Sequence, residues 1–145
     1  MAPVPSTAGP SRGSGSCWRG ERVGGEHLTL GARGEALAEQ HLKQAGYRIV
    51  ARNYRCRFGE IDLVAEEGGN LVFVEVKTRR SGVFGHPLEA VDRHKRGQLS
   101  RAARRYLEEN GASERFCRFD VVAVCLEGKP HLELVRNAFD LEEGR

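Results

Sequence analysis

The sequence predicts one α/β domain, a mixed central β-sheet of about five strands flanked by helices. Three observations support this prediction. The 145 residues suffice for one modest hydrophobic core but not for two. Short runs that alternate between apolar and polar residues, the pattern of half-buried strands, recur between residues 47 and 135. Two longer segments carry apolar residues at helical spacing, which gives the order α-β-β-β-α-β-β.

The composition is that of a soluble protein. Charged residues make up 30% of the chain, and the net charge of +3 is too small by itself to indicate a polyanionic partner. No apolar run approaches the roughly 20 residues of a membrane-spanning helix, and the N-terminus lacks the pattern of a secretory signal. The four cysteines form no C-x-x-C pair, so no structural zinc site is expected. We therefore expect a cytoplasmic protein without a membrane partner.

The two ends of the chain differ from its centre. Residues 1–30 are rich in Gly, Ser, Pro and Arg and show no sustained period. We expect them to form a disordered or non-core N-terminal tail. The domain is predicted over residues 31–140, and residues 141–145 are expected to form a short C-terminal tail.

The first helix is predicted over residues 32–45, where apolar residues recur at helical spacing and Gly46 provides a C-terminal cap. Glu35 lies on the flank of the apolar stripe, so its carboxylate can reach the edge of the core. Residues 47–54 alternate and are predicted to form the first strand.

A β-hairpin is predicted next, and the rest of the chain is arranged around it. Residues 58–64 and 71–80 are alternating, β-branched runs, and the polar, glycine-bearing segment 66–70 joins them as a turn. Because side chains in a strand alternate between faces, Glu60 and Asp62 are expected on one face of the hairpin. Ile61 and Leu63 are expected on the other.

The second helix follows a loop. Gly and Pro residues around His86 indicate that loop, in which His86 either shapes a turn or approaches a substrate. The helix is predicted from about residue 87 or 88 to Glu109. Lys95 and Gln98 lie on or near its buried side. Two further strands are predicted over residues 115–126 and 131–135.

The acidic residues of the hairpin suggest a metal site. Asp62, Glu75 and Glu35 would bring carboxylates to one point, with Lys77 beside them. Two like charges about 4 Å apart near a protein surface repel by roughly 4 kcal/mol, so the cluster needs a counter-charge. Carboxylates with a backbone carbonyl and water are the ligands that Mg²⁺ or Mn²⁺ prefers. Such an ion polarises a phosphodiester and lowers the pKa of a bound water, while Lys77 orients that water or stabilises charge in the transition state.

A simpler interpretation stands beside this one. A single acid in a strand is usually a solvated surface residue, as we expect for Glu60, Glu66 and Glu67. The Glu75 and Lys77 pair alone could be an exposed ion pair worth less than about 1 kcal/mol. Residues 72–76 are otherwise so apolar that they indicate a central strand, which favours the metal site.

The order of helix-Glu, strand-Asp, strand-Glu-x-Lys and basic helix resembles the PD-(D/E)xK nuclease superfamily. More closely, the chain is similar to the bacterial YraN family, also called UPF0102, over about residues 31–140. The resemblance implies a restriction endonuclease-like fold, Mg²⁺ or Mn²⁺ as cofactor, and metal-dependent phosphodiester hydrolysis. The segments that carry it are Gly34-Glu35, Asn53-Tyr54-Arg55, GEIDL at 59–63, FVEVKTR at 73–79, and Lys95 with Ala102-Ala103.

The resemblance also implies roles for single residues. Asp62 and Glu75 would be metal ligands, together with the backbone carbonyl of Val76. Lys77 would be the catalytic lysine. Glu35 matches the first-helix acid of Holliday-junction-resolvase-like relatives, as a further ligand. The implied catalytic set is therefore Glu35, Asp62, Glu75 and Lys77.

Basic residues bracket these acids along the chain. Arginine and lysine supply the phosphate contacts that dominate nucleic-acid affinity, so the clustering favours a surface that follows a DNA backbone. The alternative is that an arginine-rich chain places these residues on every solvated face. The candidate nucleic-acid-binding residues are Arg55, Arg57, Arg79, Arg80, Lys95 and Arg101.

Three functional hypotheses follow. The first is a metal-dependent nuclease acting on DNA, with branched or structured DNA as the candidate substrate. The second is a non-catalytic nucleic-acid-binding or scaffold protein that retains the nuclease fold. The third is a purely structural protein that binds neither metal nor DNA. The sequence is compatible with a homodimer in each case.

Overall fold

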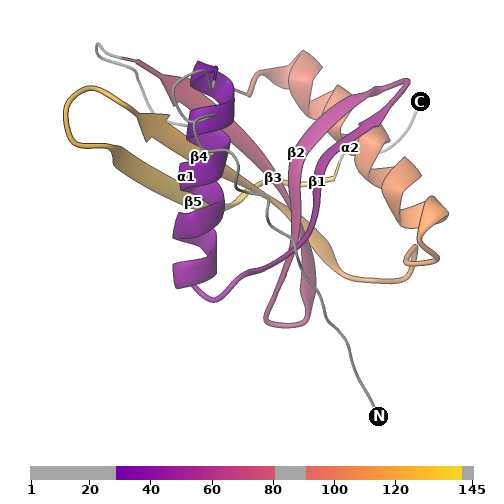
Figure 1. The fold of residues 1–145 in the computed structure, drawn as a ribbon. Helices are drawn as coiled ribbons and strands as arrows, with labels where there is room; N and C mark the ends of the chain where they lie inside the picture. Colours follow the sequence, from indigo (N-terminus) through magenta and orange to yellow (C-terminus); the bar gives the residue numbers. More distant parts are fainter. Residues whose placement is uncertain (1–28, 81–90, 142–145) are drawn as a thin grey trace.

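The computed structural model describes residues 29–80 and 91–141, and these form one mixed sheet with a helix on each face (Figure 1). The predicted order α-β-β-β-α-β-β and the predicted α/β class, a mixed five-stranded sheet flanked by helices, are confirmed. The elements are α1 (Leu30–Gln44), β1 (Arg48–Cys56), β2 (Gly59–Glu67), β3 (Asn70–Arg79), α2 (Arg93–Glu109), β4 (Cys117–Cys125) and β5 (His131–Phe139).

The strands lie in the order β1-β2-β3-β4-β5. Every neighbouring pair is antiparallel except β3 and β4, which are parallel. A parallel pair needs a crossover connection, and the chain segment between β3 and β4 contains α2. The mixed character of the sheet therefore follows from the position of α2 in the sequence.

Two hydrophobic cores cover the two faces of the sheet. On the α2 face, Tyr106 packs edge-on against Phe73, whose ring also contacts Phe119. On the α1 face, Ala38 and Leu42 pack against valines of β3 and β4. These valines alternate with the aromatic residues along each strand, so the central strands are buried on both sides.

Local residues explain where the elements begin and end. Gly68 and Gly69, with φ of 61° and 87°, form the two-residue turn between β2 and β3, as the predicted turn requires. The helix α2 begins at Arg93, because the side chain of Asp92 accepts a hydrogen bond from the N–H of Lys95. The predicted start at residue 87 or 88 is therefore wrong. The predicted loop around His86 lies outside the described residues.

The predicted alternation of the hairpin is wrong at one position. Ile61 belongs to the core on the α2 face, whereas Leu63 belongs to the core on the α1 face. Opposite this point on β1, Asn53 has a φ of 50°, in the left-handed region that turns a strand out of its regular twist. At this point, the alternation of side chains between the two faces of the sheet is shifted by one residue in both strands, and Asp62 lies at the shift.

Gly34 lets α1 approach β3 unusually closely. A Cβ atom at Gly34 would lie 1.8 Å from Oγ1 of Thr78, so only glycine fits at this crossing. Glu35 is the next residue of the helix. The close approach therefore carries the Glu35 backbone to the end of β3 that bears Glu75 and Lys77.

We expect Gly34→Ala to lower the free energy of unfolding by about 2 kcal/mol, because the added methyl group forces α1 away from Thr78. Gly31→Ala is the matched control. Nothing lies within 4 Å of a Cβ at Gly31, so it should be neutral or stabilise the helix by up to about 1 kcal/mol. Urea denaturation of both variants measures the difference, and equal stabilities would refute the close-packing account.

Candidate active site

The candidate site lies where β2 and β3 separate. The two strands pair from their turn as far as Leu63 and Val74, and beyond that point they diverge (Figure 1). The N–H of Val76 therefore has no partner in the β2 backbone. Instead, it donates a 2.8 Å hydrogen bond to Oδ2 of Asp62. The carboxyl of Asp62 thus takes the place of a backbone acceptor at the end of the β2–β3 pairing and is held against β3.

Asp62 and Glu75 form a buried acid pair. Burial and the neighbouring charge of Glu75 raise the pKa of Asp62 to about 8. Burial also raises the pKa of Glu75, although Lys95 and a hydrogen bond from Asp62 act in the opposite direction. Only 11% of the Glu75 side chain is exposed. The predicted convergence of the two acids is present, and without a cation the Asp62 carboxyl retains its proton near neutral pH.

Two lysines approach Glu75 from different elements. The Nζ atom of Lys95, on α2, lies 3.6 Å from Oε2 of Glu75. Lys77 is two residues after Glu75 on β3, on the same face, and its charge also lowers the pKa of Glu75. The sequence predicts that Lys95 lies on or near the buried side of the helix and binds phosphate, but it does not predict the contact with Glu75.

Glu35 reaches the site through Asn53. The side-chain N–H₂ of Asn53 donates to Oε1 of Glu35 and to Oε2 of Glu60, each at 3.1 Å. The charges of Glu35 and Glu60 both raise the pKa of Asp62, which places them near it. Glu60 is therefore linked to the site and is not simply a solvated residue. Asn53 was missed as a site residue, although asparagine is among the few residues that tolerate a left-handed conformation in a strand.

These donors fit a magnesium-type ion with few protein ligands. Within residues 29–80 and 91–141, no three His, Cys, Asp or Glu side chains form a ready metal-binding group. Mg²⁺ usually binds one or two carboxylates and keeps several waters. Asp62 and Glu75 supply two carboxylates. Because the N–H and the carbonyl of one residue in a strand point to the same side, the Val76 carbonyl is expected on the side of Asp62, to which its N–H donates.

A model of a family described as "Uncharacterised protein family UPF0102" matches residues 34–124, which include the acid pair and both lysines. This chain belongs to the UPF0102 family. The UPF0102 protein of Ectopseudomonas mendocina is 47% identical over 115 residues, which cover 79% of this chain and 97% of that protein. The UPF0102 protein of Moorella thermoacetica is 50% identical over 112 residues, covering 75% and 93%.

Two solved structures show a weaker likeness to this UPF0102 chain. An EndoMS–dsDNA2 complex has a TM-score of 0.38 at 22% identity, covering 63% of this chain and 35% of that chain. The structure of Pyrococcus furiosus SfsA in complex with Ca²⁺ has a TM-score of 0.33 at 14% identity, covering 73% and 61%. The fold class therefore rests on the strand order and helices of the chain itself.

The candidate phosphate-binding residues of the UPF0102 chain come from three parts of the fold. The turn between β1 and β2, the end of β3 and the start of α2 all lie away from the Gly68–Gly69 turn. Arg57 and Arg101 lie 4.9 and 6.0 Å from the centre of the Phe58 ring. Arg55 pairs with Glu60. The remaining candidates are Arg79 and Arg80, which are exposed, and Lys95.

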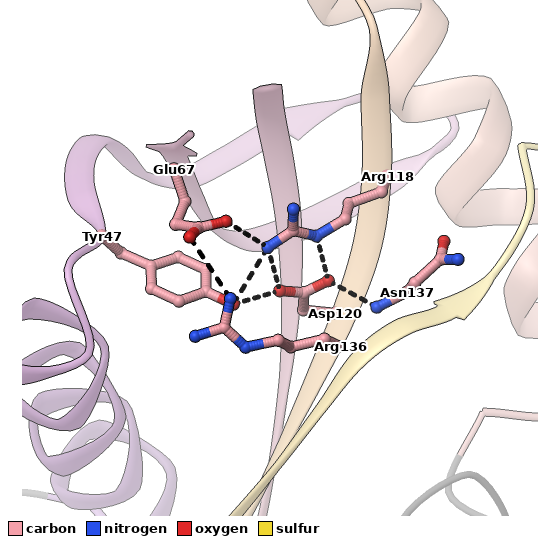
Figure 2. A network of polar contacts seen from close by, with 6 residues as sticks. All are labelled: Tyr47, Glu67, Arg118, Asp120, Arg136 and Asn137. Atoms are coloured by element: carbon pink, nitrogen blue, oxygen red, sulfur yellow. Dashed lines mark hydrogen bonds and ion pairs between the residues drawn. The ribbon is translucent and has the colours of Figure 1, made fainter. Parts of the chain in front are cut away.

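A second polar cluster lies on the α1 face of this UPF0102 fold (Figure 2). Asp120, which is fully buried, accepts hydrogen bonds from the Tyr47 hydroxyl at 2.6 Å and from Nε of Arg118 at 3.0 Å. Burial and Asp120 raise the pKa of Tyr47 to about 12. Glu67, expected to be solvated, instead pairs with Arg118 and Arg136. The drawn contacts join Tyr47, Glu67, Arg118, Asp120, Arg136 and Asn137 into a structural network.

The raised pKa of Asp62 predicts a pH-dependent stability in the absence of metal. An unfolded Asp releases its proton near 3.8, whereas folded Asp62 retains it until about pH 8. The folded state therefore binds more protons over this range, and its contribution to stability is lost as the pH rises from about 4 to 8. We expect Asp62→Asn to abolish this loss. Urea denaturation with chelator between pH 4 and 9 tests it, and parallel profiles of the two proteins would contradict the assignment.

None of the helices in the described parts of the chain is long and apolar enough to span a membrane.

Proposed function

We propose that this UPF0102 protein is a metal-dependent nuclease that hydrolyses phosphodiester bonds in DNA, with branched or structured DNA as its substrate. The observation that carries the proposal is the contact between the buried carboxyls of Asp62 and Glu75 at the opening of β2 and β3. Burying two acids together is costly without a cation. The alternative interpretation, an exposed ion pair between Glu75 and Lys77, does not explain why two carboxyls are buried next to each other.

The residues of the site would have different roles in hydrolysis. Asp62, Glu75 and the Val76 carbonyl would hold Mg²⁺ or Mn²⁺, and Glu35 would act through water as an outer ligand. The bound ion would supply Lewis acidity to the phosphate and a lowered pKa to its water. Lys77 donates a hydrogen bond to the scissile phosphate as negative charge develops there. A water that has lost a proton to solvent would form the new bond to phosphorus as the bond to the leaving oxygen breaks, and the leaving oxygen would take up a proton from solvent.

The basic residues orient the DNA. Arg57 and Arg101 lie by the Phe58 ring in the β1–β2 turn, and Arg55 is near the end of β1. Arg79 is the last residue of β3, and Arg80 follows it. Phosphate contacts of this kind set the position of a nucleic-acid backbone but carry no sequence information. The protein is therefore expected to recognise the shape of DNA and to bind it less tightly as salt concentration rises.

Cleavage assays test the proposal. Purified protein is incubated with four-way junctions, flaps, nicked duplex and single strands, in Mg²⁺, in Mn²⁺ or in chelator. We expect metal-dependent products from at least one branched or structured substrate. Salt-sensitive binding without cleavage on the whole panel would favour the non-catalytic nucleic-acid-binding hypothesis. Absence of both binding and cleavage would leave only a structural role.

A further inference from the structure

Lys95 is the feature of the site that the nuclease chemistry above does not use. From α2, its ammonium forms an ion pair with Glu75 on β3, with 3.6 Å between Nζ and Oε2, and 39% of the Lys95 side chain is exposed. Glu75 is much less exposed than its partner. Lys95 therefore places a positive charge beside the nearly buried carboxylate of Glu75, while part of the Lys95 side chain stays in contact with solvent.

The backbone of Lys95 is held in place by a hydrogen bond, whereas its ammonium group can move. The N–H of Lys95 donates to Oδ1 of Asp92 at 2.9 Å, which anchors the residue in the first turn of α2. The four-carbon side chain between that anchor and the ammonium has several rotatable bonds. The ammonium can leave Glu75 by side-chain rotation alone, with no movement of the helix.

A divalent cation and the Lys95 ammonium compete for the same carboxylate. Both are attracted by Glu75, and they repel each other at the short distances that simultaneous contact with one carboxylate imposes. Lys77 differs, because it belongs to β3 itself and no ion pair of its ammonium with Asp62 or Glu75 is observed among the described residues. Lys95 is thus the group that a cation at Asp62 and Glu75 would displace.

We propose that Lys95 is a built-in substitute for the divalent cation: it neutralises Glu75 in the cation-free protein and is released to bind a DNA phosphate when the cation arrives. This inference rests on the proposed function and adds a coupling between its two partners. Cation binding and DNA binding would each favour the state in which Lys95 has left Glu75. By linkage, each would then strengthen the other.

Mn²⁺ binding measured by calorimetry at pH 8, without DNA, tests the first half of the proposal. Lys95→Met removes the competing ammonium, so we expect Mn²⁺ to bind about five- to tenfold more tightly than to the wild-type protein. Arg93→Met is the matched control. It removes the same charge from an exposed position on the same helix turn and should change the affinity by less than about twofold. Lys95→Gln provides a second variant, and a thermal melt establishes that each is folded.

DNA binding tests the second half. Ca²⁺ serves as the cation, and the affinity for a four-way junction is measured with and without it. We expect Ca²⁺ to strengthen DNA binding by the wild-type protein and to have a smaller effect on Lys95→Met. Unchanged or weaker Mn²⁺ binding by both Lys95 variants would overturn the inference, as would Mn²⁺ binding by none of the proteins. If Mn²⁺ binds more tightly to the variants but no DNA is cut, the inference stands and the proposed nuclease activity fails.

Discussion

Asp62→Asn is expected to reduce metal-dependent DNA cleavage about a thousandfold, a loss typical of removing a key charge-stabilising group from an active site. Asparagine has nearly the shape of aspartate, and its carbonyl can still accept the N–H of Val76. The variant therefore removes the negative charge that a cation needs and keeps the hydrogen bond that closes the β2–β3 ladder. Its folding should be intact, and at pH 8 its stability should exceed that of the wild-type protein without metal.

Glu66→Gln is the matched control for this loss. Glu66 lies on the same strand near the β2–β3 turn and pairs with Arg48 and Arg115, far along β2 from Asp62. Its cleavage rate should remain within about twofold of the wild-type rate. Initial rates on the preferred substrate in Mg²⁺ provide the comparison. Cleavage that persists in Asp62→Asn would indicate a contaminating nuclease or a different active site.

Arg118→Met is expected to lower the free energy of unfolding by about 3 kcal/mol, because it leaves the carboxylate of Asp120 buried with its charge uncompensated. The Tyr47 hydroxyl and the N–H of Asn137 would still donate to Asp120, so the loss is at the lower end of that for broken buried pairs. For a domain of this size, such a loss is a large part of the total stability. Urea denaturation at pH 7 measures it.

Arg136→Met is the control for Arg118→Met. Both arginines lie over the Tyr47 ring and pair with Glu67, but the ion pair to Asp120 comes from Arg118. The Arg136 side chain is 47% exposed, and its removal should cost less than about 1 kcal/mol. Similar losses in the two variants would mean that contact with the Tyr47 ring, and not the buried charge of Asp120, determines the stability of the network.

The parts of the site that could be predicted from the sequence are those within one hairpin. The runs around residues 58–64 and 71–80 indicated two strands, and the unusual acids in them identified Asp62 and Glu75. The structure confirms the hairpin and brings these two acids together. Local alternation and turn chemistry determine such a unit, so a single sequence contains the necessary information.

The errors arise where local rules do not hold. Period-two alternation placed Ile61 and Leu63 on one face, but the left-handed Asn53 on the neighbouring strand accompanies a change of faces at Asp62. The predicted start of α2 is too early, because the apolar pattern continues on the N-terminal side of Asp92, the residue whose side chain caps the helix. A helix-capping residue such as Asp92 can be recognised in a sequence. A shift in side-chain alternation that two neighbouring strands share cannot be recognised from the sequence of either strand.

Contacts between distant segments were also missed. Asp120 lies in an apolar run that indicates only a central strand. Of its partners, Arg118 is on the same strand, but Tyr47 and Asn137 come from two distant parts of the chain. Similarly, Lys95 was assigned to phosphate binding because nothing within α2 indicates that its ammonium meets Glu75 on β3. Such pairings depend on the order of the strands and on which helix covers which face, and no local pattern encodes them.

The position of a bound cation tests the central claim most directly. Crystals grown or soaked in MnCl₂ can be measured at a wavelength where manganese scatters anomalously. We predict one strong anomalous peak between the carboxylates of Asp62 and Glu75, within about 2.2 Å of their oxygens and with the Lys95 ammonium displaced from Glu75. A peak elsewhere, or an intact Lys95–Glu75 ion pair with no peak at saturating Mn²⁺, would contradict the assignment of this pair as the metal site.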